Sequence, residues 1–343
     1  MALKGVIYDL NRIRQRSLPR SLNAAFDRRS ESIKSFVRAA RGDRKREREI
    51  LASNIKALGY QQARLLQQSL PKLEQKTACS LGLSSRPTTQ AEYSGPWFTH
   101  WCRELKIPVY FHRKIWEYAF VLQSLHDAGL LHDGAKGLGF ACGQEPLPSY
   151  FASRGISVVA TDLDPDQVRG TGWVETAQHA GTLDTLYYSD IVERSTFDAH
   201  VSLRYVDMNS IPADLKDYDF CWSICSLEHL GSIDKGLDFI KNSLSTVRPG
   251  GLSVHTTEYN YKNNAETIDN APTVLFRRRD FENIAERLRA EGHEVAPINF
   301  DVGDDFLDNL VDLPPYSEDA HLKLSIQGFA VTCFGMVIRK KDA

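Results

Sequence analysis

The stretch Lys136 to Asp164 reads KGLGFACGQEPLPSYFASRGISVVATDLD. It contains a short apolar run, a glycine turn, a helix-forming segment and a second apolar run that ends in an acidic residue. A glycine turn between a strand and a helix leaves backbone N–H groups facing a ligand. The stretch therefore predicts the first strand, turn, helix and second strand of a parallel sheet that holds a cofactor at the turn.

Asp162 stands at the end of the second predicted strand, 19 residues after Gly143. A carboxylate in this position can accept hydrogen bonds from the hydroxyls of an adenosine ribose. A nicotinamide dinucleotide and S-adenosylmethionine both carry that ribose. The spacing of Gly137, Gly139 and Gly143 is also found in nicotinamide-binding loops, so the loop alone leaves both cofactors open.

Downstream of His132, short apolar runs alternate with helical patterns, which is typical of an α/β fold with a parallel sheet. Seven strands are expected, at residues 137–141, 157–161, 201–206, 219–224, 252–257, 293–300 and 329–339. The helices expected between them cover residues 148–154, 232–247 and 278–291.

A helical region is expected before the sheet. Leu51, Leu58 and Leu65 recur at every seventh residue of a charged helix predicted over 43–70, which Pro71 ends. A second helix is predicted over 111–131, after a polar stretch at 80–96 that is interpreted as a linker. The expected domains are a basic N-terminal extension (1–90), a helical cap (91–133) and an α/β domain (134–343) with a substrate-side insertion at 301–328.

The composition is that of a folded protein, with 343 residues, 42% hydrophobic content and a net charge of −2. The first 50 residues are an exception, because they hold 14 Lys and Arg against 6 Asp and Glu. Aromatic residues are sparse there, which disfavours stacking on nucleic acid bases. We expect no stable nucleic acid partner, and either a solvated or self-associating helix or a weak membrane-surface contact.

The six cysteines are scattered, with no Cys-x-x-Cys pair and no Cys/His spacing that predicts a zinc site. The first thirty residues contain no secretory signal pattern, and the longest apolar run, at 329–338, is too short to span a bilayer. These observations predict a cytoplasmic protein without a bound metal.

Three features favour S-adenosylmethionine over a dinucleotide. Glu145 follows the turn directly, and its carboxylate would repel a diphosphate while suiting a ligand that carries an ammonium and a sulfonium. The Tyr-x-x-x-Lys pair of short-chain reductases occurs as Tyr110 and Lys114, upstream of the loop where such an enzyme would need it downstream. The third feature is a strand that ends in a polar cluster, followed by a helix and then by the turn at Pro249 to Gly251.

From Gly134 to about Tyr261 the chain resembles the class I S-adenosylmethionine-dependent methyltransferases. The resemblance implies a Rossmann-like sheet of seven strands with helices on both faces and with the last strand inserted antiparallel. It implies a cofactor site at Asp162 for the ribose, at Asp207 and Met208 for the adenine, and at the turn positions Gly139, Ala141, Gly143 and Glu145. Gly139 falls where the family has an acid, and only Gly143 keeps one of its three glycines.

The sulfonium methyl of this cofactor is already activated, so the protein has to align the acceptor and remove its proton. Glu228 and His229 follow the fourth strand, and His229 is predicted to be the general base because an imidazole titrates near neutral pH. The alternative is that Glu228 caps the next helix and His229 packs beneath the cofactor. Glu258 and Asn260, after the fifth strand, are expected to bind substrate hydroxyls or a divalent metal.

The insertion at 301–328 contains Pro314, Pro315, Tyr316, His321 and Lys323, and it resembles an insert of bacterial methyltransferases encoded with polysaccharide-assembly enzymes. The resemblance implies that Tyr316 and His321 bind the substrate and that a carbohydrate or a similar polar metabolite is methylated on oxygen. Two other functions stay open: a nicotinamide-dependent oxidoreductase, and a non-catalytic module that binds a partner through its N-terminal helix.

Overall fold

The computed structural model describes residues 20–72, 78–168, 179–317 and 321–342. Part of the basic N-terminal extension, including Arg12, Arg14 and Arg16, lies outside the described residues. The chain divides into two units, one ending at Leu58 and the other beginning at Gly59, and each is described by itself.

Helix α2 (Arg20–Gln67) begins well before the predicted start at residue 43 and ends close to the predicted end. The sequence from Arg20 onwards is rich in Ala, Arg, Lys and Glu, which all favour a helix, and it holds no proline before Pro71. Its last turns belong to the second unit, where Ala63 is buried and the Tyr60 hydroxyl donates to Asp312 at 2.6 Å.

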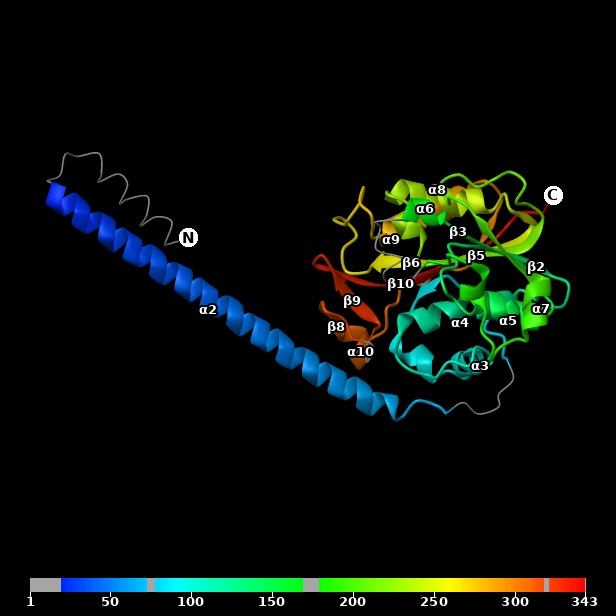
Figure 1. Ribbon diagram of the computed structural model, residues 1–343, viewed down its shortest axis with the longest axis horizontal. Coiled ribbons are helices and arrows are strands. Elements are labelled where there is room, and N and C mark those ends of the chain that lie inside the picture. The colour runs from blue at the N-terminus through cyan, green and yellow to red at the C-terminus, as the bar shows by residue number, and fades with distance from the viewer. Residues whose placement is uncertain (1–19, 73–77, 169–178, 318–320, 343) are drawn as a thin grey trace. The chain divides into compact units, whose positions relative to one another are not determined.

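The second unit is built on a ten-stranded mixed sheet (Figure 1). Its parallel part runs in the order β4 (Val201–Tyr205), β3 (Ser157–Asp162), β2 (Lys136–Phe140), β5 (Tyr218–Ile224), β6 (Val247–Asn260). β10 (Phe329–Arg339) is antiparallel to β6. The predicted α/β fold, with a Rossmann-like sheet whose last strand is inserted antiparallel, is therefore confirmed, whereas the sheet has ten strands in place of the expected seven.

Short strands complete the far edge of β10. These are β1 (Arg86–Pro87), β7 (Glu294–Val295) and β9 (Lys323–Ile326), and β8 (Val311–Asp312) pairs with β9. Of the strand predicted over 293–300, only Glu294–Val295 pairs with β10; beyond it, Ile298 forms an isolated parallel bridge with Ser85. The interpretation of 80–96 as a linker is also wrong, since this stretch forms β1 and a 3-10 helix, η1 (Gln90–Ser94).

Helices cover both faces of the sheet (Figure 1). On one face lie α3 (Pro96–Glu104), α4 (Arg113–Asp127), α5 (Leu147–Ser153) and α7 (Arg194–His200). On the other lie α8 (Ile233–Ser243) and α9 (Arg278–Ala290). Shorter turns are α6 (Pro165–Val168), η2 (Leu183–Leu186), η3 (Leu227–His229) and α10 (Phe306–Asn309). In the described part of the chain, every helix is too short or too polar to cross a lipid bilayer.

The core is rich in aromatic side chains, which come from the helices α3, α4 and α5 and from the strand β5. Trp101, Trp116, Phe151 and Trp222 are almost completely buried. Ring pairs such as Phe151 with Trp222, whose centroids lie 5.0 Å apart, lock α5 onto the sheet. His255 is buried in this core and hydrogen bonds with Ser223, Ser243 and Ser253.

Gly335 of β10 allows α4 to approach the sheet closely. A β-carbon at this position would overlap the ring of Phe120. We therefore expect Gly335→Ala to lower the free energy of unfolding by about 1–3 kcal/mol, the usual result of overpacking a core. Urea denaturation measures the loss.

Gly181→Ala is the matched control for this substitution. The nearest atom to a β-carbon there is Nδ1 of His179, 3.7 Å away, so no overlap arises. Equal stability of the Gly335→Ala variant and the control would contradict the role assigned to Gly335.

Candidate functional site

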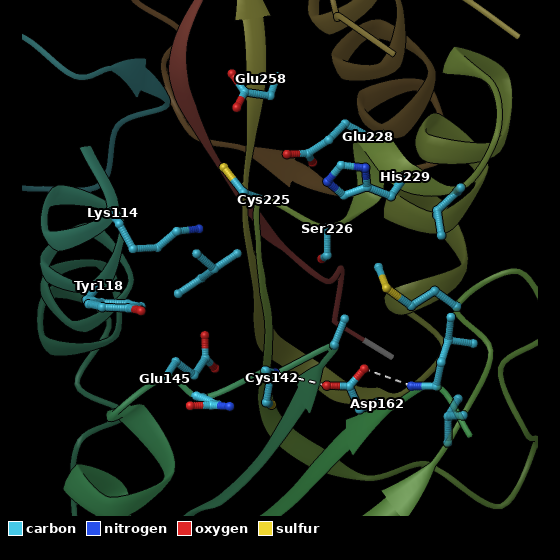
Figure 2. A pocket seen from close by; sticks show the side chains of 18 of the residues that line it. Lys114, Tyr118, Cys142, Glu145, Asp162, Cys225, Ser226, Glu228, His229 and Glu258 are labelled. Atoms are coloured by element: carbon cyan, nitrogen blue, oxygen red, sulfur yellow. Dashed lines mark hydrogen bonds between the residues drawn. The ribbon is translucent and has the colours of Figure 1, made fainter. Parts of the chain in front are cut away.

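A cavity of about 590 Å³ opens at the carboxyl-terminal edge of the parallel strands (Figure 2). Its wall is formed by the segments that follow β2, β3, β4, β5 and β6, together with the first turns of α4 and with His321. Crevices at this edge are where open α/β sheets bind their ligands. Ten predicted site residues line it: Ala141, Gly143, Glu145, Asp162, Asp207, Met208, Glu228, His229, Glu258 and His321.

The turn after β2 has a left-handed backbone at two positions. Gly143 has φ +54°, which costs glycine little, but Ala141 has φ +48°, a conformation that alanine rarely adopts. Gly139 is not among the lining residues. A β-carbon at this position would overlap Cys142 and Trp222, so the role of Gly139 is close packing beneath the turn.

Asp162 ties the turn to the end of β3. Its Oδ2 accepts from the backbone N–H of Gly143 at 3.0 Å and of Ala180 at 2.9 Å, and its Oδ1 accepts from that of Leu163 at 2.8 Å. A carboxylate offers about four acceptor positions, so a further donor from a ligand can still be accepted. The nearby carboxylate of Asp164 accepts from the N–H of Asp166 in a local turn.

Asp207 follows β4 and lies beside Met208 in the cavity wall. The Asp207 side chain is exposed, and its Oδ1 accepts from the N–H and the side-chain amide of Asn209. The Met208 side chain is buried. The pair thus presents one carboxylate and one apolar thioether at the same end of the cavity.

Glu145 is a buried acid at the cavity wall. It accepts a hydrogen bond from Nε1 of Trp222. Burial raises its pKa to about 8, against the opposing effects of the Trp222 bond and the charge of Lys114. The carboxyl group is therefore mostly protonated at neutral pH unless a cation binds beside it.

Glu228 and His229 stand in the η3 turn that follows β5 (Figure 2). Nδ1 of His229 lies 3.1 Å from the carbonyl oxygen of Pro272 and 3.2 Å from the Thr273 hydroxyl. The carbonyl can only accept and the hydroxyl can also accept, so a proton on Nδ1 of the neutral ring satisfies both contacts and leaves Nε2 as the basic nitrogen. Glu228 accepts from the Thr257 hydroxyl at 2.8 Å, and burial raises its pKa.

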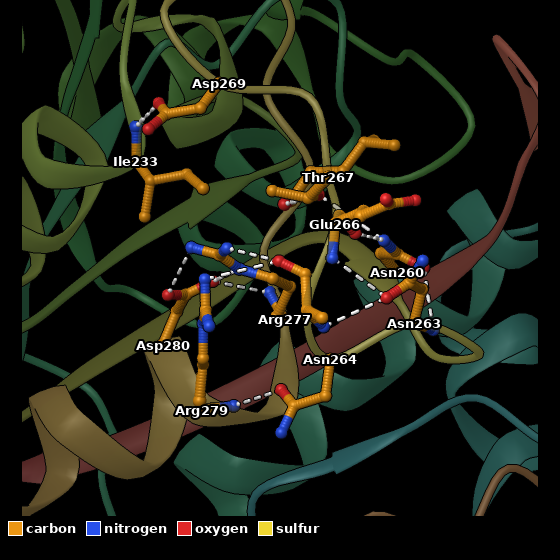
Figure 3. A network of polar contacts seen from close by, with 12 residues as sticks. Ile233, Asn260, Asn263, Asn264, Glu266, Thr267, Asp269, Arg277, Arg279 and Asp280 are labelled. Carbon is orange, nitrogen blue, oxygen red and sulfur yellow. Dashed lines mark hydrogen bonds and ion pairs between the residues drawn. The ribbon is translucent and has the colours of Figure 1, made fainter.

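A polar loop between β6 and α9 holds these residues in place (Figure 3). Asn260, predicted to bind substrate, is not among the residues that line the cavity. Its amide donates to the carbonyl of Glu266 and accepts from the N–H of Asn263, so both ends serve the loop. Arg277, which pairs with Asp280 at the start of α9, closes the loop by donating to the carbonyl of Ala265 at 3.1 Å. The Val274 N–H of the loop donates to the carbonyl of Glu228.

Cationic side chains at the start of α4 form the wall opposite the sheet. Arg113 forms a bidentate ion pair with Glu258, and both side chains are buried. The rings of His112 and His321 stack with centroids 4.6 Å apart. Burial lowers the pKa of His112 to about 3 and that of His321 to about 4, so both rings are neutral.

Tyr316, predicted to bind substrate, is not among the lining residues. Its hydroxyl donates to the carbonyl of Ser325, and its ring packs edge-on against His321. It supports His321 from outside the cavity.

Sulfur and carboxylate groups meet deeper in the wall. The ligand atoms of Cys225, Glu228 and Glu258 lie within 4.8 Å of one another, as do those of Glu117, Cys225 and Cys333. A cation in the first group would have to compete with Arg113 for Glu258, and one in the second with Lys114, which lies 3.6 Å from Glu117. Both groups are therefore compensated by protein cations.

Four lining residues at the start of α4 were not predicted from the sequence. They are the N-cap residue His112 and, within the helix, Arg113, Lys114 and Tyr118. One signal was present. Arg113 and Lys114 begin a helix whose first turn has no acidic residue, although basic groups there oppose the helix dipole. Such a placement requires compensation by acids elsewhere, and Glu258 and Glu117 supply it.

Comparison with known proteins gives only a general likeness. No protein-family model matches the chain, and no curated protein matches it. Among solved structures, the methyltransferase domain of bacterial CtHen1 is 16% identical, over 64% of this chain and 95% of that one, with a TM-score of 0.40. An S-adenosylmethionine-dependent methyltransferase from Mesorhizobium loti is 11% identical (63% and 96% covered, TM-score 0.39). The [4+2]-cyclase SpnF is 15% identical (65% and 83% covered, TM-score 0.39).

The chain and these structures have the α/β fold in common, which the strand order of the chain already establishes.

The raised pKa of Glu145 predicts a pH-dependent stability. The folded protein holds this proton up to about pH 8, whereas an unfolded glutamate loses it near pH 4.5. The stabilisation is therefore complete below pH 4.5 and is lost as the pH rises towards 8. We expect Glu145→Gln to flatten the fall in unfolding free energy between pH 5 and pH 8, measured by urea denaturation.

Glu266→Gln, at an exposed side chain, is the control and should leave this slope unchanged. An unaltered slope in Glu145→Gln would show that Glu145 is ionised in the folded protein.

Proposed function

We propose that the cavity binds S-adenosylmethionine and that the protein transfers its methyl group to an oxygen of a polar acceptor. The observation that carries the proposal is the placement of Asp162 and Asp207. They follow the adjacent strands β3 and β4, and both line the cavity beside the turn after β2. Carboxylates at these strand ends suit the ribose hydroxyls and the adenine of an adenosyl group.

The lining residues fit this ligand. The cavity volume lies within the range of small-molecule sites. The hydroxyl of Ser226, buried in the same wall, has no hydrogen-bond partner among the described residues, so it can bond to a ligand atom in the cavity. Asp162, Asp207 and Met208 would hold the adenosine, and Gly143 and Glu145 would lie at its methionine end.

The same residues disfavour a dinucleotide. Glu145 and Pro146 precede α5, whose first turn includes Pro148, so two backbone N–H groups that a diphosphate would use are missing. Tyr110 of the reductase-like pair is not among the lining residues. Burial raises the pKa of Tyr118, which keeps that hydroxyl protonated.

S-adenosylmethionine supplies an electrophilic methyl group when bound. The role of the chain is then to hold the acceptor hydroxyl and to take its proton. His229 suits this role because Pro272 fixes its Nδ1 as the donor and leaves Nε2 as the base. The carboxyl group of Glu228, which accepts a hydrogen bond from Thr257, is a second polar group beside His229.

A polyhydroxylated acceptor such as a carbohydrate suits the opposite wall. Sugar hydroxyls both donate and accept hydrogen bonds. The Arg113–Glu258 pair offers guanidinium donors and carboxylate acceptors at one place, and neutral His321 lies close by in the same wall. We also propose that the methylated carbohydrate is part of a polysaccharide or of a precursor for its assembly.

Calorimetric titration tests the cofactor. We expect micromolar binding of S-adenosylmethionine and S-adenosylhomocysteine, and at least a tenfold loss of affinity in Asp162→Ala, because the variant loses the ribose acceptor and the tie to Gly143. NAD and NADP should not bind. The control is Asp164→Ala, at a carboxylate engaged in a local turn.

Two results would overturn the proposal. Binding of a dinucleotide alone would make the protein an oxidoreductase. Absence of any binding by a folded chain would favour the partner-binding module.

The role of His229 is tested separately. With hexoses and nucleotide sugars as acceptors and labelled S-adenosylmethionine as donor, His229→Gln should reduce kcat about 10²–10⁴-fold while the Kd for S-adenosylmethionine stays unchanged. Methyl transfer is read as label in the acceptor. Unchanged kcat in the variant would assign His229 a packing role beneath the cofactor.

A further inference from the structure

Helix α2 carries an exposed apolar stripe within the first unit. Ile33, Leu51, Ile55 and Leu58 are 39%, 59%, 61% and 67% exposed. Leu51 and Leu58 are seven residues apart, and Ile55 lies between them at helical spacing. These side chains therefore lie on one face of the helix.

This face has no cover within the described part of its own unit. The described part of the unit that ends at Leu58 consists of α2 alone, so no second element there can pack against the stripe. Single exposed apolar residues are ordinary, but a repeated stripe on a long helix is typical of a helix that pairs with another.

Two charged residues interrupt the stripe and identify its partner. Arg44 and Glu47 lie on the same face as Leu51, since they precede it by seven and by four residues. Among the described residues neither forms an ion pair, whereas their neighbours do, as Arg46 with Asp43 and Lys45 with Glu49. A lipid surface would have to bury a carboxylate in its apolar phase at Glu47, which is costly.

We propose that the stripe pairs with the same stripe of a second copy of this chain, in antiparallel orientation, with Arg44 of each copy facing Glu47 of the other. In this register Leu58 of each copy faces Ile33 of the other, so large apolar side chains meet on both sides of the charged centre. A parallel pair would instead set Arg44 against Arg44 and Glu47 against Glu47. Like charges in facing positions of a helix pair are destabilising.

Arg44 and Glu47, at the centre of the stripe, fix the register of the two helices in this dimer. Two symmetric Arg–Glu pairs form in the antiparallel register. A shift by one heptad would remove both pairs, because it sets Glu47 opposite Leu51 or Val37 and Arg44 opposite Asn54 or Ala40. The pairing joins two chains and is independent of the cavity, because residues 33–58 belong to the first unit and the cavity residues to the second.

Charge reversal on the full chain tests the proposal. Sedimentation equilibrium should show a dimer for the natural sequence. Arg44→Glu and Glu47→Arg each set like charges opposite one another, so each should raise the dimer dissociation constant at least tenfold. The double variant Arg44→Glu/Glu47→Arg restores opposite charges and should return the constant to within about threefold of the natural value.

Glu49→Arg is the matched control, because it makes the same charge change on the outer face of the same helix, where Glu49 pairs with Lys45. It should leave the dimer intact. Circular dichroism checks that each variant keeps its helix content, so that weakened pairing is not mistaken for unfolding.

The orientation is read from disulfide formation between engineered cysteines. A mixture of Leu58→Cys and Ile33→Cys chains should form a mixed disulfide, and Leu58→Cys alone should form none beyond the background of the natural chain. A monomeric natural chain, a dimer insensitive to both charge reversals, or a monomer that sediments with phosphatidylserine vesicles would overturn the proposal.

Discussion

The buried ion pair between Arg113 and Glu258 is the contact on which the candidate site depends. It joins the first turn of α4 to the end of β6, two segments 145 positions apart in the chain. Removing either partner would leave an uncompensated buried charge, which costs about 3–5 kcal/mol. The pair therefore fixes the distance between α4 and the sheet edge, and with it the width of the cavity.

A second constraint acts through the neighbouring strand, β10. Glu258 belongs to β6, whose register with β10 sets Cys333 opposite it and Gly335 opposite Thr256. Gly335 admits Phe120 of α4 at close range, and Thr256 donates to Glu117 of the same helix at 2.6 Å. Packing and polar contacts thus define one position for α4, and the cations at its start face the cavity because of it.

The sequence predicted the sheet well because its strands are short apolar runs bounded by turns, a local pattern. The predicted strand ends carried Asp162, Glu228, His229 and Glu258, and the family resemblance added Asp207; all five line the same cavity. The residues it missed, Arg113 and Lys114, come from a helix that precedes the sheet in the chain. Their place in the wall follows from tertiary packing, which no local pattern reveals. Asn260 was misplaced for a related reason, since its amide is used by a loop whose path the sequence does not show.

The turn after β2 departs from the glycine pattern that the family resemblance implies, and other contacts hold its shape. Alanine stands at a left-handed position and glutamate at another expected glycine. The backbone path is held instead by hydrogen bonds, from Gly143 and Ala180 to Asp162 and from Cys142 to the carbonyl of Thr161. A carboxylate that both anchors the turn and faces the cavity links the shape of the loop to whatever binds there. Loss of glycines at this turn is for that reason a poor guide to loss of the site, and the acid at the end of β3 is the better one.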